Sequence, residues 1–155
     1  MGISSDGQIC YGISFDEDYE FPWNGEWDGE ADDIDSWWLF EVCKYKNPFE
    51  LFDDDGEWIG GIEATKEQRD AYFAPRRAFK KAHPLPVELV WHCSYEYPMY
   101  ILATPGSVLT ASRGYPKAIE SLEARPSEVA ALMAFCKEYN LEGDGPKWWL
   151  SSMCG

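Results

Sequence analysis

The most distinctive chemistry in the chain lies in an acidic stretch from Asp16 to Asp35. Half of its twenty residues are carboxylates and none is basic. Trp23 and Trp27 lie among them, whereas a charged run that stays disordered lacks such aromatic residues. We therefore interpret the stretch as a folded, strongly negative surface that binds a basic partner. Trp23 and Trp27 would serve either as anchors that hold this surface on the fold or as contact residues for the partner. Its acidic residues are Asp16, Glu17, Asp18, Glu20, Glu26, Asp28, Glu30, Asp32, Asp33 and Asp35, and the same surface is expected to include Asp53, Asp54 and Asp55.

A second group with chemical potential is the tripeptide His92-Cys93-Ser94. A cysteine nucleophile needs a histidine base within hydrogen-bond reach. Neighbouring residues of a strand point to opposite faces, so His92 is poorly placed to serve Cys93. Acidic proteins also contain many carboxylate pairs of the kind that hydrolyse glycosides. A small hydrolase that uses His92 and Cys93, or a carboxylate pair, is one alternative function, and no catalytic residue is assigned.

The spacing of the potential metal ligands does not match a metal site. The five cysteines and two histidines are scattered, without the short paired spacings of structural zinc. The run Asp53-Asp54-Asp55-Gly56 looks like a calcium loop, but an EF-hand has its invariant glycine at position six. With Gly56 there, Leu51 and Ile62 would occupy the first and last ligand positions. We therefore predict a hairpin turn at this point, no metal and no cofactor.

Net charge argues against several classes of partner. The chain of 155 residues carries a formal charge of −15, and residues 1–63 contain 18 acids but only Lys44 and Lys46 as bases. Such a field repels nucleic-acid phosphates and anionic membranes, so we expect neither partner. No apolar run approaches the roughly 20 residues of a membrane span, and we expect no signal peptide. The isolated cysteines are expected to be reduced, which favours a cytoplasmic protein.

Hydrophobic periodicity predicts the strands that would position these residues. Alternation indicates a half-buried strand over 8–15, with small residues on its second face and the larger ones, Ile9, Tyr11, Ile13 and Phe15, on its first. Further extended segments are expected over 86–93, 98–104, 107–112 and 147–154, and a hairpin over 49–60.

Helices are predicted over 37–44, 65–82 and 126–139. Thr65 and Gln68 form a capping-box pair, Ser127 is the expected N-cap of the last helix, and Pro75 should kink or split the middle one. Strands and helices that are grouped along the chain are typical of α+β proteins. We predict a single α+β domain over 1–155, with an antiparallel or mixed sheet, two to three helices and a strongly acidic N-terminal part over 16–63.

Four segments together resemble a known group of proteins. They are SSDGQICYGISF, PFELFDDDGEWIGG, HCSYEYPMYILA followed by ASRGYP, and the terminal PKWWLSS. Over most of its length the chain resembles uncharacterised small acidic proteins of tailed bacteriophages and prophages. The resemblance implies no activity and no functional residue. It does imply an accessory protein in the cytoplasm of an infected bacterium, with a host factor or a defence protein as its partner.

Charge spacing bears on whether the acidic stretch could imitate nucleic acid. Duplex DNA has one charge per roughly 1.7 Å, whereas ten acids on an extended strand of twenty residues give one per roughly 6.6 Å. Only a folded surface that brings in Asp53, Asp54 and Asp55 would approach duplex density. We therefore expect a non-enzymatic inhibitor or DNA mimic that engages a basic host or defence protein, with a merely solubilising acidic surface as the plain alternative.

A third function is that of an aromatic-rich assembly or oligomerisation protein. The eight tryptophans could form the interface of such an assembly. A basic cluster on the helix predicted over 65–82 could neutralise acidic residues within the fold or across a homodimer. Its members are Arg76, Arg77, Lys80 and Lys81.

Overall fold

A computed structural model describes residues 5–24, 33–47 and 64–154. The chain is an α+β domain with a five-stranded mixed sheet and three helices, as the sequence predicts. It divides into two compact units, Met1–Asp33 with Pro86–Gly155, and Ile34–Leu85. The hairpin predicted over 49–60, with Asp53, Asp54 and Asp55, lies outside the described residues.

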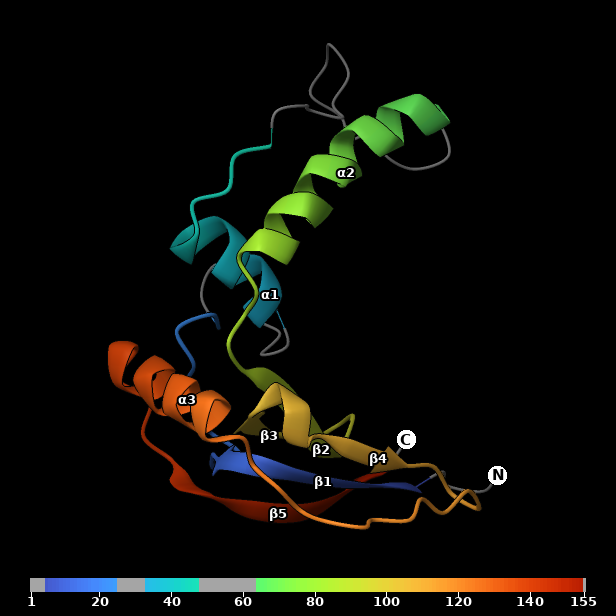
Figure 1. Ribbon diagram of the computed structural model, residues 1–155, viewed down its shortest axis with the longest axis vertical. Helices are drawn as coiled ribbons and strands as arrows, with labels where there is room; N and C mark the ends of the chain where they lie inside the picture. Colours follow the sequence, from blue (N-terminus) through green and yellow to red (C-terminus); the bar gives the residue numbers. More distant parts are fainter. Residues whose placement is uncertain (1–4, 25–32, 48–63, 155) are drawn as a thin grey trace. The chain divides into compact units, whose positions relative to one another are not determined.

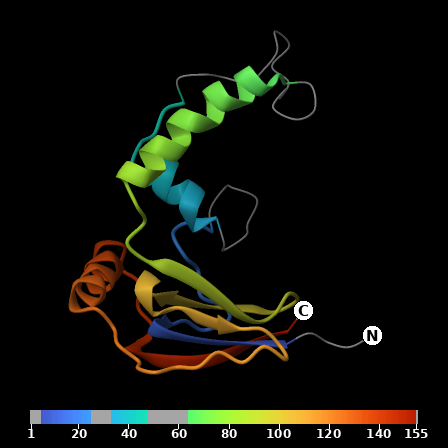
Figure 2. The same ribbon diagram turned by 45° about the vertical axis from the view of Figure 1, so that its right-hand side comes forward.

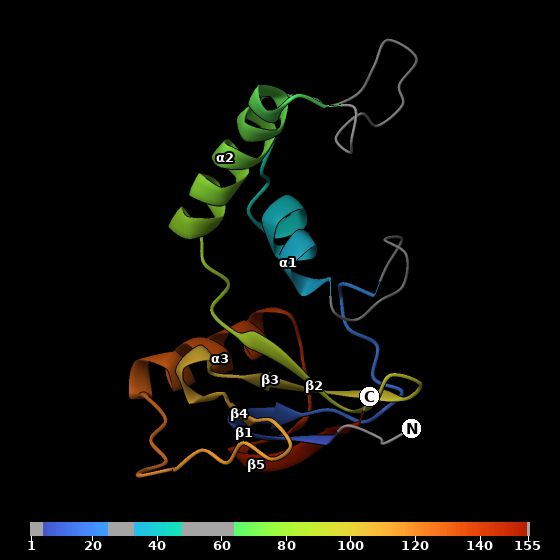
Figure 3. The same ribbon diagram turned by 90° about the vertical axis from the view of Figure 1, so that its right-hand side faces the viewer.

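The first unit contains the whole sheet and helix α3 (Figure 1). The strand order is β3-β2-β5-β1-β4, in which β2 and β5 run parallel and the other neighbours antiparallel. Figure 3 shows β1 between β4 and β5. The strands span Ser5–Ser14 (β1), Glu88–Ser94 (β2), Pro98–Ala103 (β3), Leu109–Ala111 (β4) and Asp144–Cys154 (β5).

Strand β1 organises the sheet because it pairs with three others. One side pairs with β5 along nearly its full length. The other side pairs first with β4, at Ile9 opposite Leu109, and then with β3, at Gly12 opposite Ala103. The pairing of β1 with β3 makes the sheet curl back on itself.

The curled sheet buries the small-residue face of β1, which corrects the prediction of its buried side. Of the four residues predicted to be buried, Ile13 and Phe15 are buried but Ile9 and Tyr11 are only half-buried. Cys10, on the small-residue face, is fully buried in the core. A flat sheet would leave the small-residue face of β1 to solvent. Because this sheet curls, that face lines its interior.

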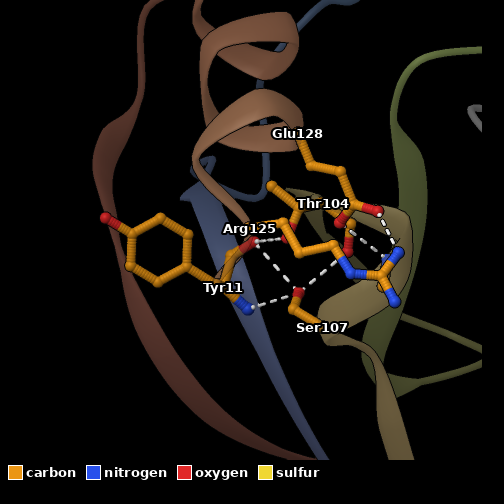
Figure 4. Close-up of polar contacts among 6 residues, drawn as sticks. Tyr11, Thr104, Ser107, Arg125 and Glu128 are labelled. Atoms are coloured by element: carbon orange, nitrogen blue, oxygen red, sulfur yellow. Dashed lines mark hydrogen bonds and ion pairs between the residues drawn. The ribbon is translucent and has the colours of Figure 1, made fainter. Parts of the chain in front are cut away.

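A short 3-10 helix, η2 (Pro105–Ser107), separates β3 from β4 and is held by buried polar groups. The Ser107 hydroxyl accepts a hydrogen bond from the Tyr11 amide at 2.9 Å and donates one to the Thr104 carbonyl at 2.8 Å (Figure 4). The Gly106 amide donates to the Glu128 carboxylate at 3.1 Å. These bonds tie η2 to β1 and to the first turn of α3.

Helix α3 spans Pro126–Glu138 and begins two residues earlier than its predicted cap implies. The prediction of Ser127 as N-cap is wrong: Arg125 is the N-cap and Pro126 is the first helical residue. Proline suits that position because its missing N–H would have no helical partner. The Arg125 guanidinium instead reaches Glu128, at 3.1 Å.

The second unit pairs a short helical segment with a long helix (Figure 2). The segment consists of α1 (Ile34–Ser36) and the π-helix η1 (Trp37–Val42), and the long helix is α2 (Lys66–Ala82). The predicted capping box of α2 is present, with Gln68 and Thr65 bonded in both directions. Pro75 lies within α2 without splitting it. Within the described residues, no helix is both long enough and apolar enough to cross a bilayer.

Hydrogen-bond and ring contacts join the two helical segments of the second unit. The Trp38 indole N–H donates to the His83 carbonyl at 3.0 Å, and the rings of Tyr45 and Phe79 lie 4.9 Å apart.

Candidate functional site

The start of the acidic stretch presents its carboxylates to solvent. Asp16, Glu17, Asp18 and Glu20 directly follow β1, and all four are exposed. Among the described residues, no lysine or arginine forms an ion pair with any of them.

The aromatic residues of the same segment point inward. Phe21 packs against Phe15 and Tyr19, with ring centroids 5.0 and 4.8 Å away, and stacks on Trp23 at 4.6 Å. Trp23 is only 1% exposed. Of the two roles predicted for this indole, anchor or contact residue, burial favours the anchor. The aromatic residues thus hold the segment on the fold while its carboxylates face out.

The loop before β5 adds two carboxylates that sequence reasoning missed. Glu142 and Asp144 are exposed, and the Glu142 amide donates to the Tyr19 hydroxyl at 3.1 Å. A side chain at Gly143 would lie 2.6 Å from the Ser14 carbonyl, so this loop approaches β1 as closely as glycine allows. Glu142 and Asp144 are isolated acids in the sequence, and no local signal could have joined them to the acidic stretch.

We call these six exposed carboxylates the acidic surface: Asp16, Glu17, Asp18, Glu20, Glu142 and Asp144. A cavity of about 490 Å³ lies within it. Asp16, Glu142 and Asp144 line the cavity together with the rings of Tyr19 and Trp149. The Trp149 indole N–H donates to the Gly12 carbonyl at 2.9 Å, which fixes the orientation of that ring. The remaining residues that line the cavity are Ser14 and Gly143.

One lysine lies beside this cavity. The Lys147 ammonium lies 2.7 Å from an Asp144 carboxylate oxygen and 4.7 Å from the centroid of the Trp149 ring. An ammonium over an indole face is attracted by the negative charge of the π-system. Two of the residues that line the cavity, Asp144 and Trp149, therefore already contact a cation supplied by the chain itself.

Of the other predicted partner-binding residues, the structure describes only Asp33 and Asp35. Asp33 is half-buried in the first unit, and Asp35 in the second unit is exposed and forms an ion pair with Lys80 at 2.8 Å. Part of the basic cluster on α2 thus neutralises an acid within the fold. The rest lie outside the described residues: Glu26, Trp27, Asp28, Glu30, Asp32, Asp53, Asp54 and Asp55.

The His92 and Cys93 pair does not form a catalytic arrangement in the described part of the chain. The Nε2 atom of His92 is buried there without a hydrogen-bond partner, and burial lowers the pKa of this imidazole. Cys93 is exposed and has a left-handed backbone with φ of 77°. All five cysteines are free, and no group of three or more Cys, His, Asp or Glu in the described ranges could hold a metal ion.

The assembly alternative depends on exposed aromatic residues. Trp23 is buried and the other tryptophans that the structure describes are half-buried, so none of them forms an exposed patch. In the described ranges, the exposed large apolar residues are tyrosines, aliphatic residues and a methionine: Tyr95, Tyr97, Leu109, Tyr115, Ile119, Leu122, Met133 and Leu150.

Comparisons with protein-family models, with curated proteins and with solved structures find no match to this chain.

Proposed function

We propose that this protein is a non-enzymatic binding protein whose acidic surface engages a basic surface of another protein. The proposal rests on the arrangement of residues 15–23, in which the carboxylates are exposed to solvent and the rings of Phe15, Phe21 and Trp23 are buried. All four carboxylates of this segment lack an ion-pair partner in the described part of the chain. Like charges held together by buried rings destabilise the fold through self-repulsion. A partner of opposite charge would relieve that repulsion.

The resemblance to phage and prophage proteins supports the identity of the partner. It favours a basic host or defence protein in the bacterial cytoplasm, for example one whose basic surface normally binds nucleic acid. Occupying such a surface would make this protein an inhibitor. Association driven by charge is fast and weakens as salt screens it, over a Debye length of about 8 Å at physiological ionic strength.

The test compares two variants that have the same net charge. The first reverses three charges on the acidic surface: Asp16→Lys, Asp18→Lys and Glu20→Lys. The control reverses three exposed acids elsewhere in the first unit: Glu120→Lys, Glu123→Lys and Glu138→Lys. Each protein is used to capture partners from a bacterial lysate at low and at high salt. Captured proteins are then purified and their dissociation constants measured against salt concentration.

We expect wild type and control to capture the same basic protein, and the acidic-surface variant to lose it. Dissociation constants should rise steeply with salt. Equal weakening of both variants relative to wild type would show that net charge alone is sensed, and equal binding by all three proteins would reject the acidic surface as the binding site. Binding that does not change with salt would reject the electrostatic basis of the proposal.

A further inference from the structure

We infer that the cavity in the acidic surface receives the cationic end of a lysine or arginine side chain from the basic partner. This inference rests on the proposed function and assigns it a specific site. The cavity is lined by three acidic residues, Asp16, Glu142 and Asp144, and by two aromatic residues, Tyr19 and Trp149. An ammonium or guanidinium is the group that both kinds of residue attract.

The position of Lys147 shows that an ammonium fits beside the residues that line the cavity. Its Nζ atom contacts the carboxylate of Asp144 and the ring of Trp149, both of which line the cavity. The pair is solvent-exposed, with side-chain accessibility of 51% for Lys147 and 67% for Asp144. Exposed ion pairs are weak because water and salt screen them, so a cation from a partner can displace Lys147.

The dimensions of the cavity fit a side chain. Its volume of about 490 Å³ lies within the range of roughly 300–1,000 Å³ that is typical of small-ligand sites. The Trp149 ring is pre-oriented by its bond to Gly12, and Tyr19 by the Glu142 amide. A pre-organised site loses little conformational entropy when it binds.

The prediction that follows is that Lys147 competes with the partner. We use hexalysine and hexaarginine as probes and measure their dissociation constants at low salt by calorimetry. Lys147→Met removes the internal cation and should tighten binding by about threefold to tenfold. Lys137→Met on α3 makes the same change in net charge at an exposed position that does not line the cavity, and should stay within about twofold of wild type.

A second pair of variants removes an acidic charge instead of a basic one, so binding of the probe should become weaker when the acid lines the cavity. Asp16→Asn should weaken probe binding by about threefold to tenfold. Glu123→Gln, an exposed acid in the segment before α3, should have an effect within about twofold. Near-ultraviolet circular dichroism checks that each variant keeps the wild-type fold, and Lys147→Gln replaces Lys147→Met if the latter does not fold.

The outcomes separate the inference from the proposed function. Suppose that Lys147→Met binds the probes like Lys137→Met, that Asp16→Asn binds them like Glu123→Gln, and that binding still depends on salt. This result would reject the cavity and leave the acidic surface as the binding site. Failure of the wild-type protein to bind either probe at low salt would reject both. Binding at least about threefold tighter in Lys147→Met than in Lys137→Met would identify the cavity as the cation site.

Discussion

Cysteine side chains in this protein differ sharply in their surroundings. Cys10 and Cys136 are buried, and burial raises the pKa of each thiol to about 11, with the Glu88 carboxylate contributing at Cys10. Cys93 is exposed. Because the thiolate is the reactive form, we expect an aromatic disulfide reagent at pH 8 to modify Cys93 first and to leave Cys10 and Cys136 untouched until the protein unfolds.

Thiol counting with and without denaturant measures this difference. Denatured protein without reductant should yield five free thiols, and Cys93→Ala should remove the fastest phase. Rapid modification of Cys10 or Cys136 in the folded protein would contradict the burial of these side chains.

His92 should make stability depend on pH. Burial lowers the pKa of the folded-state imidazole below its ordinary value of 6.5, so the unfolded chain binds the proton more readily. The free energy of unfolding should therefore fall as pH drops below about 6.5. His92→Gln should reduce this loss between pH 7.5 and 5.5, as measured by urea denaturation. His83→Gln keeps His92, so its free energy of unfolding should fall with pH as much as that of wild type. If the two variants lost equal stability between pH 7.5 and 5.5, His92 would not be the cause of the pH dependence.

At the scale of elements, two glycines of β1 have opposite roles. A Cβ at Gly12 would clash with the backbone of Leu102 on the paired strand β3, whereas one at Gly7 would meet no atom within 4 Å. Gly12→Ala should lower the free energy of unfolding by about 1–3 kcal/mol through overpacking. Gly7→Ala in the same strand should be neutral or stabilise by up to about 1 kcal/mol. Similar losses in both variants would show that β1 and β3 do not approach this closely.

The two long helices differ in how they begin, and this difference is testable. Thr65 accepts a hydrogen bond from the Gln68 amide at 3.1 Å, so Thr65→Ala should cost about 1 kcal/mol. Ser127 lies inside α3 behind Pro126, so Ser127→Ala should change stability by less than about 0.5 kcal/mol. Thermal unfolding of both variants measures this contrast. A larger loss for Ser127→Ala would reverse the assignment of the α3 cap.

At the scale of the whole molecule, we predict that the protein does not bind DNA or RNA. Its formal charge is −15, and the basic cluster of α2 is partly engaged within its own unit. The Arg76 guanidinium lies 5.1 Å from the Phe40 ring centroid, and Lys80 pairs with Asp35. A mobility-shift titration at low salt should show no complex. A micromolar, salt-sensitive complex that Arg77→Ala and Lys81→Ala abolish would instead make α2 a nucleic-acid site.

Local patterns in the sequence were sufficient to predict most of the elements. The alternation of residues 8–15, the Thr65 and Gln68 pair and the apolar segments at 86–93 and 98–104 all correspond to elements in the structure. Such signals work because side-chain period and capping depend on residues only a few positions apart. The same reasoning placed exposed carboxylates in the segment after β1, whereas the burial of Trp23 is known only from the structure.

The sequence alone therefore determined the chemical character of the acidic stretch, the positions of the strands and the start of α2. Only the tertiary structure decided that Cys10 is buried, since this requires the sheet to curl through the pairing of β1 with β3. It also decided that Asp16 shares a cavity with Glu142, Asp144 and Trp149. These residues come from opposite ends of the chain, and the long-range pairing of β1 with β5 brings them together. That pairing depends on the packing of the whole sheet, which no short window of sequence encodes.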